Sequence, residues 1–412
     1  MDASQRALTT ALVEGTLRNR SWLDFALSKS CNHSLESLPP LILQVLRMGA
    51  FQLLFHDRQA DAVVVSDSVD LARRCGHEGT AALVNAVLRS VARDGPLVEP
   101  PDIAADPVAH ISLRFSHPEW LVRRWVERLG VDETLLMAKV NGEPPHVTLR
   151  VNPLRADAET MARELREEGF CIEPGSAAPG ALRVRGSAHL VETAAYRRGG
   201  FSIQGEGSMI AGLLVSPPPG ARVVDMCAGT GGKTSHLAQI MGGQGQILAC
   251  DTDGRRLAVL QSECVRLGIG IIAARQQDAR TLAPTQDYDC CLVDAPCSGT
   301  GSLRRRPDIR WRRKEEDIAS LAQLQRELLT AAAGLVSRAG WIVYCTCSLE
   351  PEENEQVVEE FLSARPEFRA VECRPFLPML GPQDFVMDGR AVLLLPHRYG
   401  TDGMFMMRMQ RT

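Results

Sequence analysis

The stretch VVDMCAGTGGKTSH (223–236) places an apolar strand, a glycine-rich loop and the start of a helix in direct succession. Three further strand and helix pairs follow it, so that apolar strands alternate with amphipathic helices. This alternation predicts a parallel, doubly wound α/β sheet. Two late apolar runs, AVLLLP (391–396) and MFMMRMQ (404–410), lie too close together for a crossover helix, and we expect them to form an antiparallel edge.

The chain before this sheet is predicted to be helical first and mixed afterwards. From residue 1 to about 95, apolar residues recur three and four positions apart and strand alternation is absent. A Pro- and Asp-rich segment (94–107) interrupts this pattern before another helix at 116–130. Two strands that flank a helix follow from residue 146 to residue 185. The sequence thus predicts three domains: an all-α domain over 1–140, a small α+β subdomain over 141–215 and the α/β domain over 216–412.

The composition is that of a globular protein that folds in water. Of the 412 residues, 45% are apolar and 23% are charged. The 46 Lys and Arg against 50 Asp and Glu give a net charge of −4, which excludes binding of nucleic acid through overall charge and leaves only a local patch. The chain has no secretory pattern at its start and no run of about 18 apolar residues, so we expect a cytoplasmic protein without a membrane span. The 12 Cys include no C-x-x-C pair, and we expect no metal site.

Acidic residues stand at the carboxyl ends of the predicted strands, where open α/β sheets bind ligands. The glycines of the 223–236 loop allow a tight turn and a close backbone approach, but their spacing fits neither the phosphate-binding G-x-x-x-x-G-K-[ST] loop nor the dinucleotide G-x-G-x-x-G motif. Asp251 ends the second strand, where an acid accepts hydrogen bonds from ribose hydroxyls. Asp278 and Asp294 follow the next two strands. Each acid alone could be a helix cap, whereas the set indicates one ligand crevice.

Two cysteines are expected in the same crevice. Cys297 lies in DAPCSGTG (294–301) and Cys347 in YCTCSLEPEEN (344–354), each at the carboxyl end of a strand. Two thiols that face one pocket suit attack on an electron-poor ring. C5 of cytosine is not nucleophilic until a thiolate adds at C6, and a proton must later leave C5 before the thiol is released. The pair therefore favours covalent methyl transfer to a cytosine.

Five motifs of this chain are similar to those of one known family. In the α/β domain they are VVDMCAGTGGKT, LVDAPCSGTGSLRRRPDIRW and YCTCSLEPEENE, and in the N-terminal helices LRMGAFQLL and LVNAVLRSV. They resemble the bacterial RNA cytosine-5 methyltransferases of the Nop2/Sun/NSUN group, in particular the branch that acts on 16S rRNA. The resemblance covers essentially the whole chain. It implies a NusB-like all-α RNA-binding domain, a small RRM-like α+β subdomain and a Rossmann-like methyltransferase domain.

The resemblance also implies S-adenosylmethionine as cofactor and separate roles for the two thiols. Cys347 would be the nucleophile, and Cys297 would assist proton elimination and release. Where Gly229 and Thr230 stand, the family usually has Ala and Pro, a departure that bears on the affinity for the cofactor rather than on its identity. The cofactor-binding residues that the resemblance implies are Cys227, Ala228, Gly229, Thr230, Gly231, Gly232, Lys233, Asp251, Asp278 and Asp294.

A basic segment, LRRRPDIRWRRK (303–314), follows the Cys297 loop. A charge run is often a solvated face, but its place beside a thiol favours a lip that follows RNA phosphates. We expect RNA contacts from Arg304, Arg305, Arg306 and Arg310, and from Trp311 through stacking. In the helical domain, four arginines form either a second RNA surface or ordinary helix charges: Arg73, Arg74, Arg89 and Arg93. The target is a loop or flipped nucleotide, because a base inside a helix is unreachable.

Three alternative functions differ in what they require of the sequence. A NusB-like protein of antitermination without catalysis would not need both thiols and three acids. DNA cytosine-5 methyltransferases take their nucleophile from a Pro-Cys motif and lack the Thr-Cys-Ser element that this chain has at 346–348. The same chemistry on tRNA stays open from the residues alone. We predict a monomeric rRNA cytosine-5 methyltransferase.

Overall fold

The computed structural model describes residues 3–56, 59–185 and 189–412. It divides into two compact units. The helical unit comprises Met1–Glu143 together with Arg306–Arg312, and the sheet unit comprises Pro144–Arg305 together with Arg313–Thr412. The chain therefore leaves the sheet unit once, for the short segment 306–312, and then returns to it. The three predicted domain boundaries stay a prediction.

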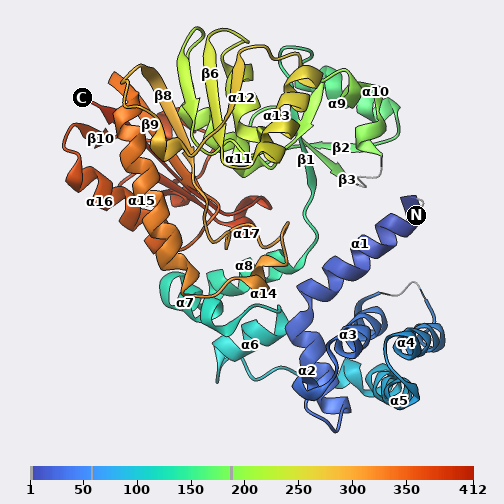
Figure 1. The fold of residues 1–412 in the computed structure, drawn as a ribbon. Coiled ribbons are helices and arrows are strands. Elements are labelled where there is room, and N and C mark those ends of the chain that lie inside the picture. The colour runs from blue at the N-terminus through green and yellow to red at the C-terminus, as the bar shows by residue number, and fades with distance from the viewer. Residues whose placement is uncertain (1–2, 57–58, 186–188) are drawn as a thin grey trace. The chain divides into compact units, whose positions relative to one another are not determined.

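The helical unit contains α-helices alone apart from short 3-10 turns, in the part of it that the structure describes (Figure 1). Apolar residues at helical spacing, among them Leu46, Val84 and Leu88, are fully buried and form its core. The helices are α1 (Ala3–Arg18), α2 (Arg20–Ser30), α3 (Pro40–Phe55), α4 (Asp61–Cys75), α5 (Glu78–Asp94), α6 (Pro107–Arg114), α7 (Glu119–Leu129), α8 (Val131–Gly142) and α14 (Ile309–Arg312). The prediction of a helical N-terminal region is confirmed.

The sheet unit begins with a four-stranded antiparallel sheet in the order β2-β3-β1-β4. The predicted strands are β1 and β3, and the predicted helix is α9, whereas β2 and β4 were not predicted from the sequence. Leu149, Met161, Leu165 and Phe201 are buried between α9 and the sheet. The elements are β1 (Val147–Val151), α9 (Ala158–Glu167), β2 (Cys171–Pro174), β3 (Ala181–Arg185), α10 (Ala194–Arg197), β4 (Phe201–Ile203) and the connecting helix α11 (Glu206–Val215).

A larger sheet forms the rest of the sheet unit, with the order β11-β12-β13-β9-β8-β5-β6-β7 and β10 paired to β13. Strands β5 to β9 are parallel, as predicted. Because parallel crossovers are right-handed and the chain moves outward in both directions from β5 and β8, α12 and α13 cover one face and α15 the other. In Figure 1, α16 lies beside α15.

The bounds of these elements are as follows. They are β5 (Arg222–Asp225), α12 (Gly232–Ile240), β6 (Gln246–Asp251), α13 (Gly254–Leu267), β7 (Ile272–Gln276), β8 (Tyr288–Asp294), α15 (Asp317–Leu335), β9 (Val336–Thr346), α16 (Glu355–Ala364), β10 (Phe368–Ala370), β11 (Phe385–Val386), β12 (Ala391–Leu394), α17 (Pro396–Tyr399) and β13 (Met404–Arg411).

The two late apolar runs form an antiparallel pair, but they do not form the edge that the sequence predicted. They are β12 and β13, and β13 also pairs along its length with β9, so it lies inside the sheet. This place explains why Met404, Phe405, Met406 and Met407 are all buried on alternate faces. The edge on this side is the short strand β11. Among the described residues, no helix is long and apolar enough to cross a membrane.

Candidate active site

Four polar strand ends meet at one edge of the large sheet. Asp225 ends β5, Asp251 ends β6 and Asp294 ends β8. Asp294 is paired in register with Cys345 near the end of β9, and Cys347 follows two residues later. Because the four strands are parallel, these side chains share the carboxyl edge at which open α/β sheets bind ligands. The structure thus brings Asp251, Asp294, Cys297 and Cys347 to one edge, as the sequence predicted.

The glycine loop after β5 adopts backbone angles that other residues reach only with strain. Gly231 adopts φ +85°, and a Cβ there would lie 2.6 Å from the side chain of Leu260. Gly229 adopts φ +56°, with open space where its Cβ would point. α12 begins directly after the loop, and the first N–H groups of a helix have no partner within the helix. The loop can therefore bring both backbone and helix N–H groups close to a ligand.

Asp251 braces this loop and keeps acceptor capacity for a ligand. Its two carboxylate oxygens accept hydrogen bonds from the N–H groups of Gly229, at 2.9 Å, and Asp253, at 2.8 Å. A carboxylate has about four lone-pair sites, so both oxygens can accept further bonds. Asp278 is placed differently: it caps the turn Ala279–Thr281 and forms a two-pronged ion pair with Arg280.

Asp225 is a site residue that the sequence analysis missed. Its carboxylate is buried and accepts hydrogen bonds from the hydroxyl of Thr234, at 2.7 Å, and from the N–H of Cys227, at 3.3 Å. Burial raises the pKa of Asp225 to about 7. The residue holds the two ends of the glycine loop together. Its only signal in the sequence is an acid at the end of an apolar strand.

The two thiols lie next to each other. The Sγ atoms of Cys297 and Cys347 are 3.3 Å apart, and both side chains are partly exposed. The hydrogen bond from Cys297 lowers the pKa of Cys347, against the effect of burial. The same hydrogen bond, together with burial, raises the pKa of Cys297. Because two neighbouring sulfurs cannot both carry a charge cheaply, these opposite pKa shifts favour ionisation of Cys347 before Cys297.

Lys233 adds a positive charge beside the thiols. Its ammonium group lies 2.7 Å from a carboxylate oxygen of Asp294, and the thiol of Cys345 donates to the other oxygen at 3.4 Å. Burial alone would lower the pKa of Lys233. The charge of Asp294 and the hydrogen bond that Lys233 donates to it raise this pKa, so Lys233 stays charged. Its charge also lowers the pKa of Cys347. From the sequence, Lys233 is expected among the cofactor residues only, and in the structure its charge also acts on Cys347.

A buried carboxylate, Glu353, joins the two cysteine loops. It accepts hydrogen bonds from the N–H of Ser298 at 2.8 Å and from the side-chain amide of Gln325 at 2.9 Å. The hydroxyls of Ser298 and Ser348 also donate to it. Each serine directly follows one of the two cysteines, so Glu353 fixes the loops to each other. The sequence analysis missed this role because the acids at 352 and 353 look like ordinary residues of a helix start.

No helix begins directly after the Cys347 loop, although Pro351, Glu352 and Glu353 would suit a helix start that lowers the pKa of a nearby thiol. These residues form a three-residue 3-10 turn, and α16 begins only at Glu355. A single turn has little dipole, and the effect decays within one turn of a helix end. Cys297 and Lys233 lower the pKa of Cys347 instead.

Part of the basic segment is buried, which corrects the prediction for Arg304 and Arg310, whereas Trp311 is half-buried and its RNA contact stays a prediction. Arg304 is buried and donates to the carbonyls of Gly400 and Pro144. Arg310 is fully buried, and its guanidinium group donates to backbone carbonyls of four residues of the helical unit: Arg18, Phe115, Ser116 and Asn141. The indole N–H of Trp311 donates to the carbonyl of Leu17 at 2.8 Å. These three side chains pack the protein, and RNA cannot reach Arg310 in this arrangement.

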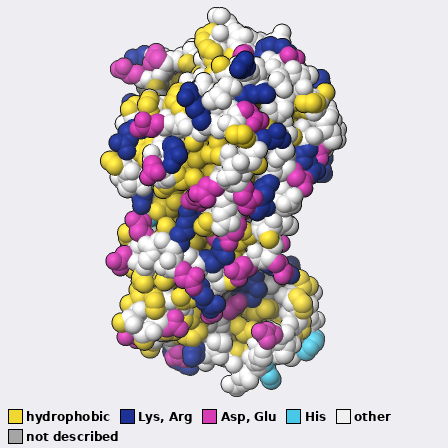
Figure 2. Space-filling model, turned by 90° about the vertical axis from the view of Figure 1, so that its left-hand side faces the viewer, with side chains coloured by type: hydrophobic (Ala, Val, Ile, Leu, Met, Phe, Trp, Pro, Cys, Tyr) yellow, Lys and Arg dark blue, Asp and Glu magenta, His cyan; other side chains and the backbone are white. Residues whose placement is uncertain are grey.

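Arg305 and Arg306 remain at the surface. Both are exposed, and Arg305 forms an ion pair with the nearly buried Asp402. Figure 2 shows that Lys and Arg side chains are mixed with Asp and Glu over the face in view, without one large basic patch. The mixture of charges on this face is in line with the net charge of −4.

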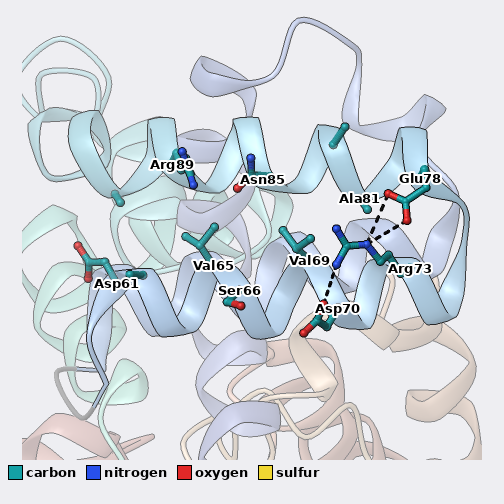
Figure 3. Close-up of a pocket in the computed structure, with 13 residues that line it drawn as sticks. Asp61, Val65, Ser66, Val69, Asp70, Arg73, Glu78, Ala81, Asn85 and Arg89 are labelled. Atoms are coloured by element: carbon teal, nitrogen blue, oxygen red, sulfur yellow. Dashed lines mark hydrogen bonds and ion pairs between the residues drawn. The ribbon is translucent and has the colours of Figure 1, made fainter.

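The helical unit has a groove of about 650 Å³ between α4 and α5 (Figure 3). Val65 and Val69 line it together with Asn85. At one end, Arg73 forms ion pairs with Asp70 and Glu78. Of the four arginines considered from the sequence, Arg93 is also paired, with Asp94, whereas Arg74 and Arg89 are exposed. A second RNA surface on this unit stays a prediction.

Comparison with known proteins identifies the family. Residues 212–410 match the model of the 16S rRNA methyltransferase RsmB/F family, residues 1–93 that of the NusB family and residues 117–190 that of the ferredoxin-like domain of RsmF/B-like methyltransferases. The probable ribosomal RNA small subunit methyltransferase B of Bacillus subtilis is 35% identical over 98% of this chain and 90% of its own length. The chain belongs to the RsmB/F family of 16S rRNA methyltransferases.

Two further relatives agree with this assignment. The probable ribosomal RNA small subunit methyltransferase B of Synechocystis is 31% identical over 98% of this chain and 91% of its own length. The crystal structure of PH0851 matches with a TM-score of 0.84 at 29% identity, covering 100% of this chain and 91% of that protein. The predicted fold, a NusB-like helical domain followed by a methyltransferase domain, is confirmed. As a member of the family, the chain is an rRNA methyltransferase of the S-adenosylmethionine-dependent class.

Proposed function

We propose that this RsmB/F-family enzyme transfers a methyl group from S-adenosylmethionine to C5 of a cytosine in 16S rRNA, with Cys347 as the nucleophile. The observation that carries the proposal is the pair of thiols 3.3 Å apart, with the pKa of Cys347 lowered and that of Cys297 raised. A thiol pair in which one member carries the charge and the other the proton fits covalent catalysis followed by elimination. In this proposal the enzyme acts as a monomer.

The residues at the sheet edge fit S-adenosylmethionine. Asp251 has acceptor sites left for the two ribose hydroxyls, and Asp278 stands after the neighbouring strand, where it would accept from the adenine amino group. The N–H groups of Cys227, Ala228, Gly229 and Gly231 already have partners within the protein, so the start of α12 at Gly232 is the part that would offer N–H groups to the amino-acid end of the cofactor. When bound, the cofactor supplies the methyl group. Lys233 and Asp294, which the sequence places among the cofactor residues, are paired with each other near Cys347, so in this proposal they also serve the reacting base.

In the first step the thiolate of Cys347 adds to C6 of the cytosine. A bond forms between Sγ and C6, and the electron pair of the C5–C6 double bond moves toward C5, which becomes nucleophilic. The pyrimidine ring gains electron density at N3 and O2 as the bond forms. Lys233, held as a cation against Asp294, stabilises this density and the thiolate that precedes it.

With the methyl group bonded to it, C5 is saturated and carries both that group and its original proton. In the second step C5 loses this proton and the enzyme is released. Once Cys347 is bound to carbon it no longer carries a charge, so Cys297 no longer has to donate to a thiolate and can give its own proton to water. The thiolate of Cys297 then accepts the C5 proton. The C5–C6 double bond re-forms, the bond between C6 and Sγ breaks, and Cys347 leaves as a thiolate. Both cysteines return to their starting protonation.

Arg305 and Arg306 are the members of the predicted RNA lip that their placement still supports. Their exposed guanidinium groups follow directly on the Cys297 loop, and phosphate contacts at this place would position RNA without reading its sequence. Their contribution is a proposal that rests on this placement.

Replacement of Asp251 by alanine is expected to weaken the binding of S-adenosylmethionine. The change removes acceptors for the ribose and also the brace on Gly229, and the loss of a buried hydrogen-bonding partner costs about 1–3 kcal/mol. Titration calorimetry with the purified variant measures this loss. Asp253→Ala, which removes the exposed cap of α13 next to the site, is the matched control and should bind as the parent does. Equal affinity in the Asp251 variant would overturn the assignment.

The substrate is tested by bisulfite sequencing of rRNA and tRNA from a strain that lacks the gene. We expect one cytosine of 16S rRNA to lose its methylation and all tRNA cytosines to keep theirs. Complementation with the normal gene should restore the mark, and complementation with the Cys347→Ala variant should not. Loss of a tRNA mark with intact 16S rRNA would instead favour the alternative tRNA substrate.

A further inference from the structure

Arg313 reaches the backbone of the Cys297 loop from a distance of sixteen positions along the chain. Its Nε donates to the carbonyl of Ser298 at 3.0 Å, and its Nη2 donates to the carbonyl of Cys297 at 3.2 Å. A guanidinium group that holds two successive carbonyls fixes both the position and the direction of the peptide between them. The residue held in this way carries the thiol that takes the C5 proton in the proposed mechanism.

The chain directly after Arg313 is fixed as well, within the sheet unit. The N–H of Lys314 donates to a carboxylate oxygen of Asp317 at 3.1 Å, at the start of α15. Arg313 itself lies 3.8 Å from the same carboxylate. Its side chain therefore has little freedom to leave the Cys297 loop.

Two other contacts hold this loop from the opposite side. Glu353 accepts from the N–H of Ser298, and Gln325 donates to the carbonyl of Pro296 at 2.9 Å. These contacts leave the carbonyls of Cys297 and Ser298 to Arg313, which donates to both of them. The carboxylate of Glu353 thus holds the loop through an N–H group, and the guanidinium group of Arg313 holds it through two carbonyls.

We propose that Arg313 is a positioning residue that holds Cys297 over the reacting base, and that it acts in the release step rather than in RNA binding. The inference rests on the proposed role of Cys297. An error of about 1 Å in the place of a reacting group can cost about 100-fold in rate. Addition of Cys347 to C6 depends on the Cys297 loop only through the hydrogen bond that lowers the pKa of Cys347. Loss of Arg313 should therefore slow release more than attack.

The test compares Arg313→Ala, Arg313→Lys and Cys297→Ala in the full-length enzyme with a 16S rRNA fragment. Arg313→Ala should lower kcat by roughly 10- to 100-fold with little change in KM for RNA, and should accumulate a protein–RNA adduct that survives denaturing electrophoresis. Arg313→Lys keeps the charge but not the two-pronged contact, so it should recover only part of kcat. Thermal unfolding and cofactor binding should match those of the parent enzyme.

Arg312→Ala is the matched control for the loss of one positive charge. Arg312 is the neighbouring residue, and its side chain is 78% exposed. This variant should form no adduct, and if Arg312 contacts phosphate, the variant should lower RNA affinity and flatten its salt dependence. Arg313→Ala should leave that salt dependence as it is.

The outcomes separate failure of this inference from failure of the proposed function. If Cys297→Ala forms an adduct and Arg313→Ala turns over like the parent enzyme, the role of Arg313 is wrong and that of Cys297 stands. If Arg313→Ala flattens the salt dependence and Arg313→Lys restores full activity, Arg313 contacts phosphate and does not position the loop. If Cys297→Ala itself forms no adduct, the role of Cys297 fails and the inference fails with it.

Discussion

Replacement of Cys347 by alanine is expected to abolish methyl transfer to RNA. Without a thiolate to add at C6, C5 of cytosine stays non-nucleophilic, and enzymes that lose their nucleophile fall in rate by roughly 10⁴-fold or more. Transfer of labelled methyl groups from S-adenosylmethionine to a 16S rRNA fragment measures the effect. Cofactor binding should be retained, because no cofactor residue is changed.

Cys264→Ala is a suitable control for the loss of a thiol. Cys264 is buried on α13, away from the crevice, and packs in the core of the sheet unit. It should retain methyl transfer at the parent rate. Substantial activity in Cys347→Ala alongside a normal control would mean that another residue attacks the base.

Replacement of Cys297 by alanine is expected to spare the first methyl transfer and to block the following ones. The variant keeps the nucleophile but loses the group that accepts the C5 proton, and general base catalysis is worth roughly 10²–10⁴-fold. Cys297 also lowers the pKa of Cys347 in the parent enzyme, so attack should slow somewhat at neutral pH. Single-turnover and steady-state measurements on the same RNA separate the two effects.

A steady-state rate that falls together with the single-turnover rate, by the same factor, would contradict this division. It would show that Cys297 acts before or during the attack. Raising the pH should partly restore the attack step in the variant, because more Cys347 is then ionised without the hydrogen bond from Cys297.

Local sequence patterns were sufficient to predict the parallel sheet and the two cysteine loops. Asp251, Asp294 and Cys347 each follow directly after an apolar strand. In a parallel sheet, residues in this position all lie at the carboxyl edge. The N-terminal helices were equally clear, because their apolar residues recur at helical spacing over long stretches. The family resemblance then implied which thiol attacks, and this role stays a proposal that the geometry of the thiol pair supports.

Contacts between residues far apart in the chain could not be predicted in this way. Seven basic residues in 303–314 indicate a solvated or RNA-facing surface, yet Arg310 is buried because carbonyls at positions 18, 115, 116 and 141 converge on its guanidinium group. The function of Glu353 depends likewise on Ser298, more than fifty positions away. In both cases the sequence around one residue contains no sign of its distant hydrogen-bond partner.

The place of β13 in the sheet was missed for a similar reason. The sequence showed that β12 and β13 lie too close for a crossover, but not that β13 pairs with β9 on its other side. Strand pairing depends on which edge is free when the sheet is assembled, and this is a property of the whole domain. The uninterrupted apolar run from Met404 to Met407 is a local signal of a strand with neighbours on both sides.

The central claim is that Cys347 attacks the base and Cys297 releases it, and it is tested most directly by comparing the two alanine variants on one denaturing gel. Each variant is incubated with S-adenosylmethionine and the same 16S rRNA fragment, and protein that carries RNA through denaturation is counted. We expect a strong adduct band with Cys297→Ala and none with Cys347→Ala, because only the first variant can form the bond between Sγ and C6. An adduct with Cys347→Ala and none with Cys297→Ala would contradict the account and reverse the roles of the two thiols.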